Sequence, residues 1–168
     1  TASLRKIDNS AEVIATVKKK VGLDIILLSG EKEAKTSFNS VKDTDLTTDK
    51  GIVIDLGGGS CEVIDFVNKT VITSESMPIG VSSCYLEYVS GLFPNATEVN
   101  EIENRVLSEL KKLVVTNDTQ RNDLFGIGRS DKTIKKVLLY LGWIDDDAEY
   151  IPVSMLDDLL GEFSQPTQ

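Results

Sequence analysis

The chain has 168 residues, 40% of them hydrophobic and 27% charged, the proportions of a globular domain with a core of its own. Its net charge of −9 speaks against broad, non-specific binding to nucleic acid, which requires Lys and Arg against phosphates. The absence of histidine excludes Ser-His-Asp and Cys-His catalysis, and no apolar run approaches the ~20 residues that span a bilayer. Two cysteines are too few for a disulfide framework, so we expect a reducing, cytoplasmic compartment.

The N-terminal part of the chain predicts two helices with a strand between them. Asn9 or Ser10 can cap a helix that runs to about Lys20 and is followed by Gly22. An uninterrupted aliphatic run at 25–28 predicts a short buried strand. The next two segments are predicted to be a second helix and a solvated loop, at 31–41 and 42–50.

A glycine-rich stretch dominates the middle of the chain. The β-branched run at 52–54 predicts a strand covered on both faces, and a second strand follows at 61–66. Three glycines at 57–59 allow the backbone to approach a ligand closely and to aim several N–H groups at one anion. Asp55 and Glu62 flank this turn, and two carboxylates beside a phosphate-sized gap suggest a divalent cation such as Mg²⁺. From these residues alone, the alternative is a glycine-rich β-hairpin whose acids face water.

The rest of the chain predicts further strands and helices. A strand at 70–77 follows a hairpin turn at Asn68-Lys69, and Thr97 is the predicted cap of the clearest amphipathic helix. In chain order, the other expected elements are a short helix at 81–89, a strand at 123–128, a helix with Ile134, Val137, Leu138 and Leu141, and a last helix from Ser154 to about Phe163. This succession indicates an α/β domain with a mixed sheet and flanking helices.

Four short motifs, in order along the chain, resemble those of the Ppx/GppA family, the exopolyphosphatases and guanosine pentaphosphate phosphohydrolases. The glycine turn at 55–62 is similar to the family's D-[IL]-G-G-G-S-T-E, with Cys61 where the family usually has Thr. The other three segments are T-A-S-L-R, S-G-E-K-E-A and S-M-P-I-G, at 1–5, 29–34 and 76–80. They are similar to the family's T-S-A-L-R, S-G-x-E-E-A and S-[LM]-P-[LI]-G. Four ordered motifs are more specific than any one of them.

The resemblance implies the actin-like ATPase (ribonuclease H-like) fold, in which two lobes enclose an active site in the cleft between them. Residues 1–41 would then be the end of the first lobe with the interlobe helix, and residues 42–168 the second lobe. The family's opening D-x-G-S-N-S loop, its first phosphate loop, has no counterpart in the sequence. We therefore expect the chain to be a fragment of a longer enzyme.

The same resemblance implies roles for individual residues. Glu33, which directly precedes Ala in the S-G-x-E-E-A match, would orient or deprotonate the water that attacks the terminal phosphorus. Without the motif, Glu33 reads as an acid in the first turn of a helix, where the dipole favours Glu, and Glu31 is expected only to be solvated. Phosphate binding is implied for Gly57, Gly58, Ser60 and Arg5, and Mg²⁺ binding or water positioning for Asp55 and Glu62.

One further segment departs from the family pattern. Residues 126–130 resemble the family's G-V-G-G-T turn, but Arg129 stands where the family has a glycine. An arginine at that position either crowds the loop or adds a contact to phosphate.

Three functions remain open. The first is phosphoanhydride hydrolysis, which releases the terminal phosphate of inorganic polyphosphate or the 5′ γ-phosphate of guanosine pentaphosphate (pppGpp). The second is a sugar kinase or other ATPase of the same superfamily, against which the S-G-x-E-E-A match argues. The third is a lobe that binds phosphate or a partner protein without activity of its own. Expected ligands are polyphosphate or guanosine penta- or tetraphosphate with Mg²⁺; we expect neither nucleic acid nor membrane as a partner, and a homodimer stays open.

Overall fold

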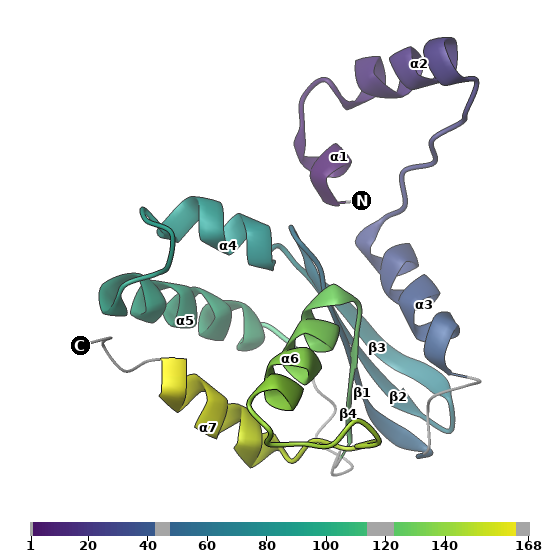
Figure 1. Ribbon diagram of the computed structural model, residues 1–168. Coiled ribbons are helices and arrows are strands. Elements are labelled where there is room, and N and C mark those ends of the chain that lie inside the picture. The colour runs from purple at the N-terminus through teal and green to yellow at the C-terminus, as the bar shows by residue number, and fades with distance from the viewer. Residues whose placement is uncertain (1, 43–47, 114–122, 164–168) are drawn as a thin grey trace.

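The computed structural model describes residues 2–42, 48–113 and 123–163. Within them, a four-stranded sheet has the order β3-β2-β1-β4 (Figure 1). Strand β2 (Cys61–Val67) pairs antiparallel with both β1 (Lys50–Leu56) and β3 (Thr70–Met77), whereas β4 (Leu124–Ile127) runs parallel to β1. The prediction of an α/β domain with a mixed sheet is therefore confirmed.

Helices cover both faces of the sheet (Figure 1). Helix α3 (Gly30–Val41) lies on one face, and α4 (Val81–Tyr88), α5 (Ala96–Leu110), α6 (Arg129–Tyr140) and α7 (Val153–Phe163) lie on the other side. Helices α1 (Ala2–Lys6) and α2 (Ser10–Val21) extend beyond the end of the sheet. None of the helices in the described part of the chain has the length and apolar composition that a bilayer crossing requires.

The alternation of side chains along the strands separates two apolar clusters. Val53, Ile64 and Phe66 face α3 and pack against Ala34 and Phe38. The residues between them along the strands face the other side, where Cys61, Met77, Ile79, Ile54, Leu56 and Val63 pack with Cys84, Val106 and Leu113. Because successive residues of a strand point to opposite faces, β2 is buried on both sides and forms the centre of the core.

The two hairpin turns lie where the sequence predicts them. The glycine turn joins β1 to β2, and Asn68-Lys69 joins β2 to β3. Both Asn68 and Lys69 have positive φ, of 48° and 56°, as a tight hairpin turn with the twist of the strands requires. The predicted loop at 42–50 falls largely on residues 43–47, which lie outside the described residues.

The prediction of a strand at 25–28 is wrong. Residues 22–29 have no regular secondary structure, and Ile26 is 80% exposed. A strand needs a neighbouring strand for its N–H and C=O groups, and this segment leads from α2 to α3 away from the sheet (Figure 1). The carbonyl of Leu28 instead accepts a hydrogen bond from the Arg5 guanidinium at 2.9 Å.

One helix and the starts of two others also differ from the predictions. Helix α1 is absent from them, because five residues are too few to carry a periodic pattern. Helix α5 is capped by Asn95, whose side chain accepts hydrogen bonds from the first turn, and not by Thr97. Ser154 lies inside the first turn of α7 and not before it.

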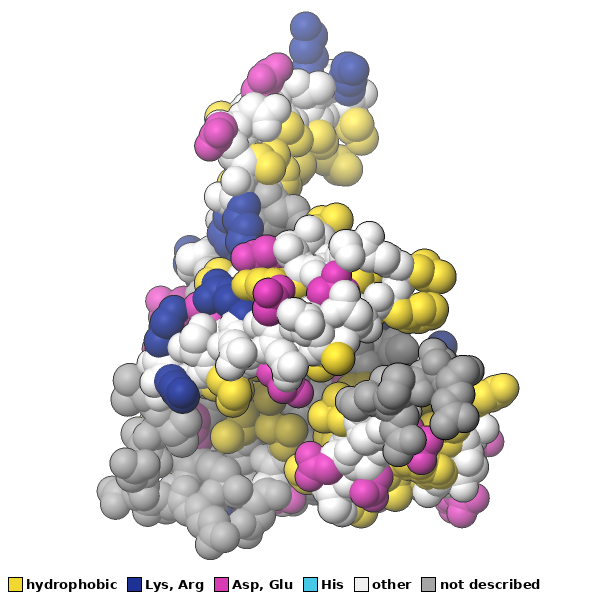
Figure 2. Space-filling view, turned by 90° about the vertical axis from the view of Figure 1, so that its left-hand side faces the viewer, with side chains coloured by type: hydrophobic (Ala, Val, Ile, Leu, Met, Phe, Trp, Pro, Cys, Tyr) yellow, Lys and Arg dark blue, Asp and Glu magenta, His cyan; other side chains and the backbone are white. Residues whose placement is uncertain are grey.

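The segment at α2 leaves apolar surface uncovered. Figure 2 shows hydrophobic side chains gathered along α2 below its lysines. Val21 and Leu23 are both more than half exposed, and Ile7 is exposed as well. This part of the chain therefore contributes little to the two core clusters.

The aromatic contacts of Phe66 allow a test of the core. Phe66 is fully buried, with ring centroids 5.4 Å from Phe38 and 5.9 Å from Phe125. We expect Phe66→Ala to lower the free energy of unfolding by about 3–5 kcal/mol, because the lost contacts leave a cavity. Phe93→Ala is the matched control, since Phe93 is 79% exposed. Equal effects of both changes on urea denaturation would contradict this description of the core.

Candidate active site

The turn between β1 and β2 is fixed by a hydrogen bond within the turn and by two hydrogen bonds from the start of α4. The N–H of Gly57 donates to the carbonyl of Ser60 at 3.0 Å and closes the turn. The first residues of α4 donate to the turn's carbonyl groups: Val81 N–H to Gly57 at 3.0 Å, and Ser83 N–H to Gly58 at 2.9 Å. These bonds use two N–H groups that a helix start would otherwise leave unpaired.

Gly80 permits this close contact between α4 and the turn. A Cβ at Gly80 would lie 2.6 Å from the carbonyl carbon and oxygen of Gly58 and from the nitrogen of Gly59. Backbone atoms cannot move aside as a flexible side chain does, so only glycine fits there. The S-M-P-I-G motif therefore has a structural role in positioning the glycine turn.

The carbonyl contacts with α4 determine where the N–H groups of the turn point. A trans peptide directs its N–H opposite to its C=O. Since the carbonyls of Gly57 and Gly58 point to α4, the N–H groups of Gly58 and Gly59 point away from α4. Neither has a hydrogen-bond partner among the described residues. The turn thus offers two adjacent donors to an anion, as glycine loops that bind phosphate do.

This arrangement differs in part from the sequence prediction. The resemblance implies that Gly57 donates to a phosphate, but the Gly57 N–H is used inside the turn, and the N–H of Gly59, which has no implied role, is free instead. The N–H of Gly58 is free to donate to an anion, as the resemblance implies. Ser60 is 6% exposed, and its hydroxyl has no hydrogen-bond partner within the described part of the chain. The turn type decides which glycine is free, and the letters G-G-G alone do not specify it.

Asp55 and Glu62 lie next to each other at the base of the turn. They are paired residues of β1 and β2, so their Cβ atoms are about 4.5–5.5 Å apart on one face of the sheet. That face is the one covered by α3, because Val53 and Ile64, two residues from each, belong to the α3 cluster. The sequence prediction that the turn brings these two acids together is consistent with this geometry.

Each of the two carboxylates accepts a hydrogen bond from a serine. Ser37 of α3 donates to Asp55 Oδ2 at 2.6 Å, and Ser76 of β3 donates to Glu62 Oε1 at 2.8 Å. Glu62 is 2% exposed, so the alternative of an acid facing water does not hold for it. Gly30 packs so tightly over Ser76 that a Cβ there would lie 2.6 Å from the Ser76 Cβ. The start of α3 therefore covers the Glu62 side of the site.

Cys61 precedes Glu62 in β2, and its side chain lies on the opposite face of the sheet from Asp55 and Glu62. Burial raises the pKa of its thiol to about 11, and the negative charges of Glu62 and Asp55 act in the same direction. The thiol therefore stays protonated near neutral pH and is a poor nucleophile. Its side chain packs with Met77 and Ile79, as expected of a small apolar residue.

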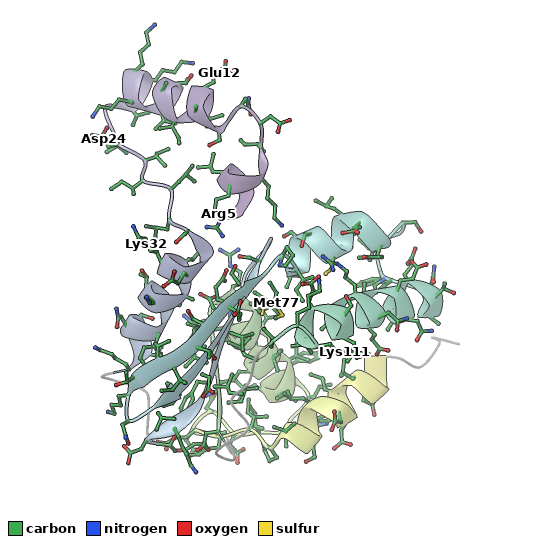
Figure 3. The ribbon with its side chains drawn as sticks, turned by 180° about the vertical axis from the view of Figure 1, so that it is seen from behind. Arg5, Glu12, Asp24, Lys32, Met77 and Lys111 are labelled. Atoms are coloured by element: carbon green, nitrogen blue, oxygen red, sulfur yellow. The ribbon has the colours of Figure 1, made fainter. Side chains whose placement is uncertain are left out.

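The two remaining predicted residues are in direct contact with each other. Arg5 of α1 forms an ion pair with Glu33 at 2.5 Å and also donates to the Leu28 carbonyl. Figure 3 shows Arg5 below α1, between that helix and the first turn of α3. Glu33 lies in this first turn, which Ser29 caps by accepting from the Lys32 N–H. The residue expected to act as the base and the residue expected to clamp a phosphate are thus paired with each other.

Two polar residues at the site have no place in the sequence predictions. Lys6 follows Arg5 in α1, and its Nζ donates to the Gly59 carbonyl at 2.8 Å. Asp131 lies in the first turn of α6, and its Oδ1 is buried without a hydrogen-bond partner among the described residues. Burial raises the pKa of Asp131, and the Asp55 charge contributes in the same direction. The only sequence signal for either is position: Lys6 follows the T-A-S-L-R motif, and Asp131 follows the G-I-G-R-S turn.

The G-I-G-R-S turn joins β4 to α6 at the same edge of the sheet. Ile127 is paired with Asp55 in the parallel ladder, and a Cβ at Gly128 would lie 3.1 Å from Asp55 Oδ1. Gly128 has a φ of 106°, which suits only glycine, and Ser130 Oγ donates to the Leu56 carbonyl at 2.9 Å. Arg129 is exposed at the start of α6, so it does not crowd the loop.

The donor set fits Mg²⁺ better than a metal that needs a complete protein cage. No three Cys, Asp or Glu side chains among residues 2–42, 48–113 and 123–163 gather into a metal-binding group. In phosphate sites, however, Mg²⁺ keeps several waters and takes one or two carboxylates together with substrate phosphates. Asp55 and Glu62 supply such a pair of oxygen ligands, and each has one oxygen that no serine contacts.

These features define an α/β domain with a glycine turn that can accept an anion and carboxylates beside it. The chain belongs to the Ppx/GppA phosphatase family, whose sequence profile matches residues 1–151. It is 27% identical over 117 residues to "Exopolyphosphatase 1" of Mycobacterium tuberculosis, a match that covers 69% of this chain and 34% of that protein. It is 38% identical over 87 residues to a "Guanosine-5'-triphosphate,3'-diphosphate pyrophosphatase" of Pseudoalteromonas translucida, covering 52% of this chain and 17% of that one.

Solved structures of the family have the same fold. A family member from Aquifex aeolicus superposes with a TM-score of 0.70 at 23% identity, over 96% of this chain and 52% of that one. An exopolyphosphatase from Cytophaga hutchinsonii gives 0.73 at 20% identity, over 86% of this chain and 47% of that one. The predicted actin-like ATPase fold is confirmed. The chain spans about half of these structures and a smaller part of the curated relatives.

The contact between Gly80 and the turn yields a prediction about the site's geometry. Gly80→Ala should push α4 away from the turn and lower the free energy of unfolding by about 1–3 kcal/mol, the usual cost of overpacking. Gly91→Ala is the matched control, because its Cβ would meet its nearest atom at 3.6 Å, an ordinary contact. The measurement is urea denaturation of both variants, and an unchanged midpoint for Gly80→Ala would contradict the tight contact.

Proposed function

We propose that the chain is part of a phosphoanhydride hydrolase that releases the terminal phosphate of inorganic polyphosphate or the 5′ γ-phosphate of pppGpp. The observation that carries the proposal is the shared position of two free N–H groups, at Gly58 and Gly59, and of the Asp55 and Glu62 carboxylates. Family membership and the names of the two curated relatives support the substrate classes.

In this proposal the turn binds the terminal phosphate, which water attacks and the enzyme releases. The N–H groups of Gly58 and Gly59 donate to its oxygens, and the free hydroxyl of Ser60 adds a third donor. Such fixed donors stabilise charge in the transition state without having to reorganise. Asp55 and Glu62 would hold Mg²⁺, which when bound neutralises phosphate charge.

Glu33 is the proposed base, and Arg5 holds it in place. A carboxylate that orients the attacking water must be fixed, and the 2.5 Å ion pair with Arg5 supplies that constraint. A guanidinium has five N–H donors, so Arg5 can hold Glu33 and the Leu28 carbonyl and still donate to a phosphate. Arg5 can therefore both bind a phosphate and hold Glu33 in position.

The substitution Glu33→Gln tests the base. It keeps the shape of the side chain but removes its ability to accept a proton. In the full-length protein that contains this chain, we expect turnover of polyphosphate or pppGpp to fall by about 10²–10⁴-fold, with KM little changed. The readout is inorganic phosphate released from each substrate in the presence of Mg²⁺.

Glu31→Gln is the control for the loss of one negative charge. Glu31 is two residues away, exposed, and paired with Lys35 at 2.6 Å on the outer surface of α3. Its removal should leave turnover within about twofold, as for an exposed surface pair of small energetic weight. Equal effects of both changes, or normal turnover of Glu33→Gln, would exclude Glu33 as the base.

The isolated 168-residue chain should release little or no phosphate. The relatives are longer, and in a two-lobe fold the other wall of the cleft would come from outside these residues. Robust Mg²⁺-dependent release of phosphate by the isolated chain would contradict this expectation. Binding of polyphosphate without hydrolysis, by the isolated chain and by the full-length protein alike, would favour the alternative of a phosphate-binding lobe. Transfer of phosphate from ATP to a sugar would favour the alternative of a kinase.

A further inference from the structure

The geometry points to Lys6 as a second phosphate-binding residue, one that contributes an uncompensated positive charge at the glycine turn. This inference rests on the proposed function and adds a residue that the four motifs do not contain. It follows from the direction of the turn's peptides and from the different partners of the two neighbouring cations in α1.

Arg5 and Lys6 are adjacent, but their charges are used differently. Arg5 is paired with the Glu33 carboxylate, so its positive charge is largely compensated. Lys6 Nζ contacts a neutral group, the Gly59 carbonyl at 2.8 Å, and has no carboxylate partner among the described residues. Of the two, Lys6 therefore has the more available charge for an anion.

Lys6 also contacts the turn at a residue that offers a free N–H group to an anion. Helix α4 occupies one side of the turn, where it contacts the carbonyls of Gly57 and Gly58. The N–H groups of Gly58 and Gly59 point away from α4, and Lys6 contacts the carbonyl of Gly59, the residue that carries one of these two N–H groups. An anion held by those N–H groups would lie close to Lys6.

Lys6 has further donors for a charged ligand beside the contact that it makes with Gly59. An ammonium group has three donors, and a hydrogen bond to a phosphate oxygen is stronger than one to a neutral carbonyl. Lys6 can keep the Gly59 carbonyl with one N–H and donate to phosphate with another. Binding of a phosphate chain would thereby also tie α1 to the turn.

The test measures KM and kcat for polyphosphate and pppGpp in the full-length protein that contains this chain. Lys6→Gln keeps a donor group but removes the charge, and we expect KM to rise about 10- to 100-fold, as when one charge-assisted hydrogen bond is lost. Lys6→Arg, which keeps the charge, should recover most of the affinity. The KM difference between Lys6→Gln and wild type should shrink with added salt, because screening weakens the charge.

Lys32→Gln is the matched control. Lys32 is an exposed lysine in the first turn of α3, next to Glu33, and the substitution removes the same charge. It should change KM less than twofold. An active wild-type enzyme whose KM is unchanged by Lys6→Gln, or is not recovered by Lys6→Arg, overturns the role of Lys6 alone. A wild-type protein that neither binds nor hydrolyses polyphosphate and pppGpp overturns the proposed function, and this inference with it.

Discussion

The contact between the start of α4 and the glycine turn is the constraint on which the site depends. Two helix N–H groups hold the carbonyls of Gly57 and Gly58, and this fixes the orientation of the peptides between them. Because each peptide is planar, the same bonds direct the N–H groups of Gly58 and Gly59 to the opposite side. The direction of these two free N–H groups is therefore imposed by α4, which lies on the opposite side of the turn. Gly80 makes this possible, since any side chain there would meet the backbone of the turn.

How much of this is visible in the sequence depends on the range of the interactions. The strands and both hairpins follow from local patterns, because alternation and turn residues act over a few positions. The strand expected at 25–28 failed because pairing depends on a neighbour, and the aliphatic run carries no information about whether one is near. Which of Gly57 and Gly59 has a free N–H group likewise depends on the three-dimensional structure. The motifs identify the right segment, but only the hydrogen bond from Gly57 to Ser60 inside the turn determines that the Gly57 N–H is used and the Gly59 N–H is free.

The residues from α1 could be predicted only in part. Arg5 was found through a motif, whereas its pairing with Glu33 joins residues 28 positions apart and has no local signature. Lys6 belongs to a five-residue helix that carries no periodic pattern, and its contact with Gly59 spans 53 positions. Both contacts depend on how the segment before α3 folds back over the end of the sheet. Polar contacts between residues so far apart cannot be predicted from a single sequence, because no local pattern encodes them.

The balance of charge at the site explains why a cation should be needed there. The chain carries a net charge of −9, and its proposed ligand is also an anion. Glu33 is compensated by Arg5, but among the described residues Asp55 and Glu62 each have only a serine hydroxyl as a donor. An ionised carboxylate as deeply buried as Glu62 is costly unless it is paired, and a phosphate beside it would add repulsion. Lys6 can offset one of these charges and not both. A divalent ion between the two carboxylates and the phosphate would remove the conflict, which gives a physical reason to expect Mg²⁺ beyond the resemblance of the motif.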